Sequence, residues 1–236
     1  MSVPSAKEMA VALRQTGRAL HQKKIIEAGN VFEELARITV AHGKESFTWS
    51  YEISKSNPIV FKRKYDRHLN KTIQPQIYAS ISVQRSPAGG VCFRRLDLAL
   101  EVLDDEGNVL IKHHIDFANS PKDQFQEGPL FHLQFGGHTP GHTKSFEVPI
   151  KEPRWLCFPL DVVLLCEVVV ANFYPEDWAE LKNLPGWNAP IIASQKLCII
   201  PFLNALHIKA STSSRSLLDQ VWATSLGATY IAEGFS

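Results

Sequence analysis

The spacing of apolar residues changes twice along this chain, and these changes limit the folds that it can adopt. From Ser5 to about His42 apolar residues recur every three or four positions, as they do on one face of a helix. From Phe47 apolar and polar residues alternate, which is typical of strands with one buried face. After Pro153 the helical spacing returns. Helices, then strands, then helices favour an α+β fold over the alternating order of a parallel sheet.

The alternating region predicts a single antiparallel sheet of about five to seven strands. Residues 47–53, 77–83 and 131–135 alternate clearly, and residues 94–119 predict a hairpin. Gly107 lies in the turn of that hairpin, where a positive φ is needed. Short connections between strands imply antiparallel pairing, which allows one face to pack while the other remains polar.

We expect one α+β domain over residues 1–236, with terminal helices packed on one face of the sheet. Its parts are residues 1–45, helical, residues 46–150, the sheet, and residues 151–236, mainly helical. Gly29 is expected to divide the first helical region.

The C-terminal part begins with an apolar run over residues 155–174. It predicts a central helix with Pro159 in the first turn, although a buried strand also fits its valine content. Glu167 in this run is expected to pair with a cation if it is buried. A further helix opens at Pro175, and a last one, capped by Ser213 or Ser214, is predicted to contain Trp222.

Composition and charge say little about partners. The net charge of +1 draws the protein to neither nucleic acid nor an anionic membrane. The four cysteines lie far apart without a C-x-x-C pair, which favours a reducing compartment. Asp161 and Glu167 interrupt the most apolar run, and the first twenty residues lack a continuous apolar segment. We therefore expect a cytoplasmic protein that does not associate with a membrane.

Five of the nine histidines fall within thirty residues, 113–142. Alternation places some of them on the polar face of the sheet if the two strands that carry them are neighbours, and the glycines at 136–141 let the next loop turn back over that face. Histidine can act as acid, base or metal ligand, and Asp97 or Asp116 can orient a ring or complete a metal shell. The candidate catalytic residues are His114, Asp116, His132 and His138.

This candidate site has two open questions. The spacing H-x5-H-x3-H matches no known metal motif, so no metal ligand is assigned, the cofactor stays open, and a solvated face explains the same residues. A slip of one residue in the hairpin register would also exchange His113 for His114 on the polar face.

A basic run, "FKRKYDRHLNK" at residues 61–71, is the second candidate site. Such cations bind phosphates, and binding would then weaken with salt, although a solvated loop has the same composition. The candidate ligand-binding residues are Lys62, Arg63, Lys64, Arg67, Lys71 and Arg95.

Three classes of function remain open. The preferred one is a subunit of a larger assembly that binds RNA, DNA or another phosphate-containing ligand. The second is a histidine- or metal-dependent nuclease or hydrolase. The third is an adaptor that contacts a protein partner, or a second copy of itself, through the tryptophan-rich C-terminal third. The sequence has no G-x-S-x-G, Walker or dinucleotide motif, which disfavours the corresponding enzymes.

Overall fold

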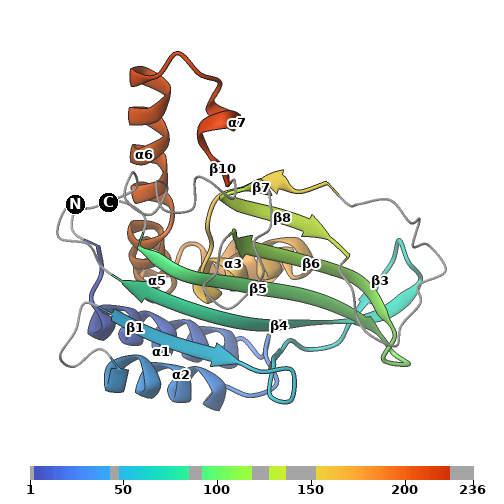
Figure 1. The fold of residues 1–236 in the computed structure, drawn as a ribbon. Coiled ribbons are helices and arrows are strands. Elements are labelled where there is room, and N and C mark those ends of the chain that lie inside the picture. Colours follow the sequence, from blue (N-terminus) through green and yellow to red (C-terminus); the bar gives the residue numbers. More distant parts are fainter. Residues whose placement is uncertain (1–2, 43–47, 85–91, 119–127, 137–152, 224–236) are drawn as a thin grey trace.

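In the computed structural model, two helices lead into a long curled antiparallel sheet, and further helices follow (Figure 1). The structure describes residues 3–42, 48–84, 92–118, 128–136 and 153–223. The helices are α1 Ala6–Gln22, α2 Asn30–His42, α3 Val162–Phe173, α4 Pro175–Leu181, α5 Pro185–Leu197, α6 Ile199–Thr212 and α7 Leu217–Gln220. The strands are β1 Thr48–Ile53, β2 Ile59–Val60, β3 Lys64–Asp66, β4 Lys71–Gln84, β5 Phe93–Asp104, β6 Val109–Phe117, β7 Gly128–Pro129, β8 Phe131–Phe135, β9 Trp155–Leu156 and β10 Trp222–Ala223. The predicted α+β fold is confirmed.

The sheet has the order β1-β4-β5-β6-β8-β9, and all of its pairs are antiparallel. Strand β4 is long enough to pair with β1 at one end and with β2 and β3 at the other. The predicted hairpin joins β5 to β6, and Gly107 has the expected positive φ of 86°. Alternation therefore identified the central strands and their turn correctly.

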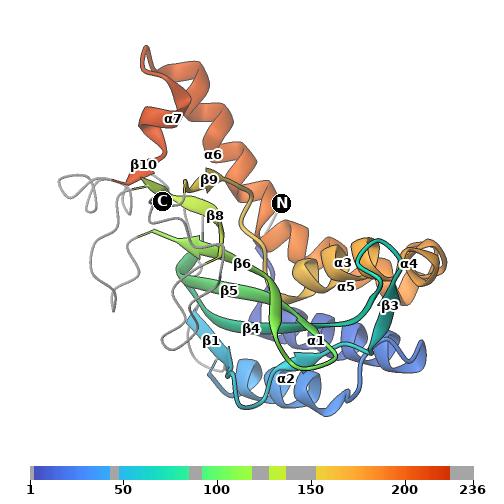
Figure 2. The same ribbon diagram turned by 90° about the vertical axis from the view of Figure 1, so that its right-hand side faces the viewer.

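The helices α1, α2, α3 and α5 lie on one side of the sheet (Figure 2). The sheet buries its apolar side chains against them, including Ile77 and Ile81 on β4 and Leu98 on β5. Ser5 begins α1 with a capping box, in which its hydroxyl accepts the Glu8 N–H and the Glu8 carboxylate accepts the Ser5 N–H. The other face, which carries the polar side chains, holds the candidate site.

The apolar run after Pro153 forms a helix, so the alternative of a buried strand was wrong. Helix α3 begins at Val162, after an N-cap at Asp161, and Pro159 precedes it rather than lying in its first turn. Glu167 is only half-buried, because it lies on the side of α3 that also carries the exposed Val168. The condition for a buried ion pair at Glu167 is therefore not met.

The last part of the chain differs from the expectation in detail. Helix α7 ends at Gln220 and its N-cap is Ser216, while Trp222 belongs to β10 and pairs with Pro129 of β7. Helix α6 extends away from the sheet (Figures 1 and 2). The helical segment Pro185–Thr212, 28 residues, meets the length and composition of a membrane span, a test that core helices of soluble proteins also pass.

Candidate metal-binding site

The strand register places a row of polar side chains across the face opposite the helices. Ser80 of β4 lies opposite Asp97 of β5, Asp97 opposite Asp116 of β6, and Asp116 opposite His132 of β8. His114 lies on the same face of β6, because it is two residues from Asp116. The strands that carry His114 and His132 are neighbours, as the sequence argument required.

Three of these side chains converge. One ligand atom each from Asp97, His114 and Asp116 lies within 4.8 Å of the others. Donor atoms on one ion are at most about 4.4 Å apart, because each bond is about 2.0–2.2 Å long. Side-chain movements of less than about 1 Å would therefore let all three bind a single ion.

His132 extends this cluster from the neighbouring strand. Its side chain is almost completely buried, with a residue exposure of 1%, and its Nε2 lies 3.9 Å from Asp116 Oδ2. Its Nδ1 lies 3.0 Å from the carbonyl oxygen of Pro129. A carbonyl can only accept, so Nδ1 carries the proton and Nε2 presents a lone pair. That Nε2 has no hydrogen-bond partner among the described residues.

Both histidines favour the neutral form that a metal requires. Burial lowers the pKa of His132. Burial and then the charge of Lys112 lower the pKa of His114, against the opposing charges of Asp97 and Glu101. An imidazole held through Nδ1–H by a backbone carbonyl, with Nε2 free, is the usual arrangement of a histidine ligand. The four side chains together offer two nitrogen and two carboxylate ligands.

A buried ion pair borders the cluster. Glu101 and Lys112 lie opposite each other on β5 and β6, one row from His114, with residue exposures of 7% and 5%. The Lys112 Nζ–Glu101 Oε1 distance is 3.5 Å, and Tyr78 Oη donates to Glu101 Oε2 at 3.2 Å. Burial, followed by the charge of Glu101, raises the pKa of Tyr78 to about 12. Sequence reasoning missed this pair, although alternation assigns both residues to the polar face.

The remaining predicted catalytic residue, His138, lies outside the described residues. His113 faces the apolar side, where its ring packs edge-on against Phe135 with centroids 4.9 Å apart. The register therefore places His114, not His113, on the polar face.

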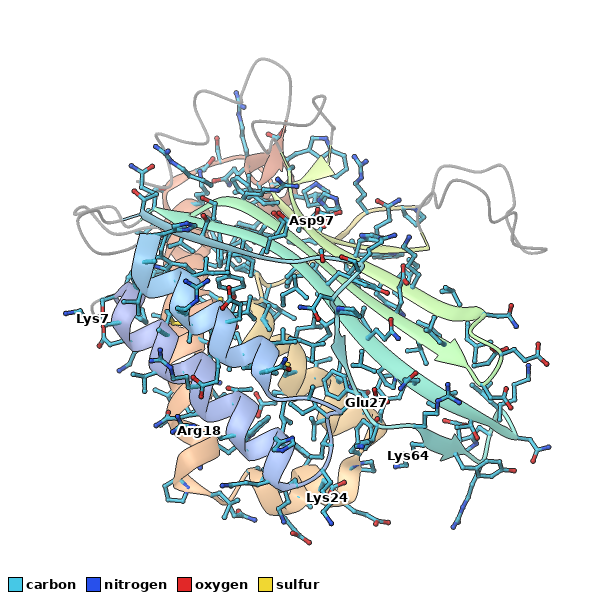
Figure 3. All side chains as sticks on the ribbon, turned by 90° about the horizontal axis from the view of Figure 1, so that it is seen from below. Lys7, Arg18, Lys24, Glu27, Lys64 and Asp97 are labelled. Carbon is cyan, nitrogen blue, oxygen red and sulfur yellow. The ribbon has the colours of Figure 1, made fainter. Side chains whose placement is uncertain are left out.

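The structure does not bring the predicted ligand-binding residues together. Lys64 pairs with Ile73 and Arg95 with Ser82, so nine residues of β4, about 30 Å, separate them. Lys64 lies far from Asp97 along the sheet (Figure 3). The guanidinium of Arg95 lies instead beside the candidate metal cluster of Asp97, His114 and Asp116, with one terminal nitrogen 3.7 Å from Asp97 Oδ2.

The rest of the basic run lies around β3. Lys62, Arg63 and Arg67 are exposed, and their side chains make no ion pair within the described part of the chain. Lys64 Nζ lies over the ring of Tyr174, 5.6 Å from its centroid, and Lys71 Nζ lies 3.6 Å from Asp104 Oδ2. The run is thus partly free for a ligand and partly used by the fold.

The tryptophan-rich third does not present its tryptophans on one surface. Trp187 is completely buried, whereas 57% of Trp155 is exposed. Lys182 Nζ covers the ring of the half-buried Trp178 at 4.8 Å. An adaptor role for this third remains a prediction.

Comparisons with protein-family models, curated proteins and solved structures found no match to this chain.

Proposed function

We propose that the protein is a divalent-metal-dependent hydrolase whose metal ligands are Asp97, His114, Asp116 and His132. The observation that carries this proposal is the buried, unpartnered Nε2 of His132, which lies 3.9 Å from Asp116 Oδ2, next to the convergent donors of Asp97, His114 and Asp116. A solvated polar face would leave such an atom in contact with water. A lone pair that is buried and unshared instead favours an ion as its partner.

The ligand types narrow the choice of ion. Calcium and magnesium prefer oxygen ligands alone, whereas two imidazoles with two carboxylates suit manganese, iron or zinc. When bound, such an ion lowers the pKa of a coordinated water and so supplies a nucleophile near neutral pH. Asp97 and Asp116 would provide the negative charge that holds the ion, and Pro129 would fix the orientation of the His132 ring.

The first experiment measures the metal. Untagged protein would be titrated with Mn²⁺ and Zn²⁺ by calorimetry, and its metal content would be determined by mass spectrometry. We expect one ion per chain, and loss of that ion in H132Q and D116N. His207 is exposed on α6, far along the chain from the cluster, so H207A is the matched control.

Activity is measured on the same samples with 4-nitrophenyl phosphate. Hydrolysis should depend on added metal, disappear in H132Q and D116N, and persist in H207A. Melting temperatures separate loss of the site from loss of the fold. A chain that binds no ion, or variants as active as the wild type, would exclude this function.

A second candidate function is binding of nucleic acid through the basic run. The exposed and unpaired Lys62, Arg63 and Arg67 favour it, because a phosphate backbone needs only well-placed cations. This function does not require the metal cluster and is tested separately.

A further inference from the structure

We infer that the pocket beside the metal cluster binds the phosphate group of a small phosphoester about the size of a nucleotide. This inference rests on the proposed hydrolase function and names its substrate class. The pocket has a volume of about 540 Å³ and lies at the β1 end of the sheet. Its polar lining consists of His42, Ser50, Glu52, Ser80, Ser82, Arg94 and Arg95.

The pocket adjoins the cluster through shared strands. Ser80, which lines the pocket, is the cross-strand partner of Asp97. Arg95 lines the pocket as well, and its terminal nitrogen lies 3.7 Å from Asp97 Oδ2. Rows two residues apart on one face are separated by about 7 Å, so a phosphate on Arg95 would lie within reach of an ion at Asp97.

An irregularity in the sheet brings two arginines into this one pocket. Successive residues of a regular strand point to opposite faces. Between β4 and β5, however, Ser82 pairs with Arg95 and Val83 with Phe93, so Arg94 is the extra residue of a β-bulge. Bulges redirect side chains and are frequent beside active sites. Here the bulge allows both Arg94 and Arg95 to line the same pocket.

The charges and donors of the lining suit an anion. The lining contains two guanidinium groups and one carboxylate, that of Glu52, and its three serine hydroxyls add further donors. Arg95 Nε is buried and has no hydrogen-bond partner among the described residues. Arginine binds phosphate through several N–H groups at once, and an unused buried donor is what such a site would contain before its ligand arrives.

The size and the apolar wall point to a small molecule. A volume of about 540 Å³ lies within the range of ligand pockets, which is about 300–1,000 Å³. Ile38 and Tyr51 also line the pocket and would contact the organic part of the ester. Hydrolysis of such an ester forms a P–O bond to the oxygen of water and breaks the P–O bond to the alcohol. The alcohol leaves with one proton of that water.

The test uses two probes on the full chain loaded with Mn²⁺. They are inorganic phosphate and the methylenephosphonate analogue of AMP, which cannot be hydrolysed because carbon replaces its ester oxygen. Calorimetry should show tighter binding of the analogue than of phosphate. R94Q/R95Q should weaken binding of the analogue about tenfold or more, because charge-assisted hydrogen bonds are lost. The control K7Q/K24N removes the same charge on the helical layer and should leave affinity unchanged (Figure 3).

Several results would overturn the inference. One such result is an equal loss of analogue affinity in R94Q/R95Q and K7Q/K24N. Another is a loss of analogue affinity in K62Q/R63Q but not in R94Q/R95Q. A third is an equal affinity of the protein for phosphate and for the analogue. If R94Q/R95Q does not fold, R94Q alone decides the question, since Arg94 is exposed and its loss should still weaken binding several-fold. Metal content measured on each variant separates the two proposals. If the chain binds no metal, the hydrolase proposal is wrong. The same comparison of variants on metal-free protein would then still test whether Arg94 and Arg95 bind the phosphate.

Discussion

At the scale of single residues, Asp161 supports a helix and at the same time carries a buried carboxyl group. It caps α3 by accepting the Leu164 N–H at 3.0 Å, and Ser194 Oγ donates to it at 2.7 Å. The side chain is completely buried, and burial raises its pKa against the opposing effect of these hydrogen bonds. The folded protein therefore holds the Asp161 proton to a higher pH than the unfolded chain does.

This shift predicts a pH-dependent effect of D161N. The stabilising contribution of Asp161 is complete below the unfolded pKa of about 4 and declines as pH rises through the raised folded pKa. Asparagine keeps a capping oxygen but does not titrate. We expect D161N and wild type to melt at similar temperatures near pH 4 and D161N to melt several degrees higher near pH 7. Calorimetric melting across this range checks it, and a constant difference would contradict it.

Single-residue predictions from the sequence were reliable where alternation was regular. Alternation alone placed His114 and Asp116 on the polar face and His113 on the apolar face, and the strand register agrees. The direction of the Arg94 side chain lies outside what alternation can predict, because the bulge adds one residue to β5. A bulge depends on how two strands pair, so no pattern within a single strand reveals it.

At the scale of elements, the contact of α1 with α2 depends on the absence of a side chain. A Cβ added at Gly17 would lie 2.5 Å from Phe32 Cβ, which is closer than two carbon atoms that are not bonded to each other can approach. Phe32 is completely buried and its Cβ is fixed to the backbone of α2. The glycine therefore permits the two helices to pack at their present distance.

We predict that G17A destabilises the protein although alanine favours helices. The clash should lower the free energy of unfolding by about 1–3 kcal/mol, whereas the higher helix propensity of alanine raises it by about 1 kcal/mol. Gly186 in α5 is the matched control, because a Cβ there meets nothing within 4 Å, so G186A should be neutral or stabilising. Urea denaturation measures both. A G17A variant as stable as G186A would show that α1 and α2 can move apart at little cost.

The sequence predicted some elements and not others, for reasons visible in the residues. The strands were found because alternation persists over many residues of β4 and β5. Helix α5 was not predicted, because its first residue, Pro185, is of a type that can both end one helix and begin the next. Trp222 was assigned to a helix because its spacing fits one, but pairing with β7 decides its structure.

At the scale of the whole molecule, the order of strands decides which distant residues can act together. His132 joins Asp116 only because β8 pairs with β6, and Arg95 joins Asp97 although it was grouped with the basic run. Strand order is a long-range property that local patterns do not carry. The candidate metal cluster around Asp97 and the basic run around Lys64 therefore lie in separate parts of the sheet (Figure 3).

This separation predicts how nucleic acid would bind, if the basic run is its site. Each phosphate neutralised by a cation contributes about 0.7–0.9 to the slope of log affinity against log salt. K62Q/R63Q should therefore weaken binding of a single-stranded oligonucleotide and reduce that slope by about 1.5. K7Q/R18Q removes equal charge from α1 and should change neither. Fluorescence anisotropy over a series of salt concentrations measures both slopes. If K62Q/R63Q and K7Q/R18Q have the same effect, attraction follows net charge alone and the basic run is not a specific site.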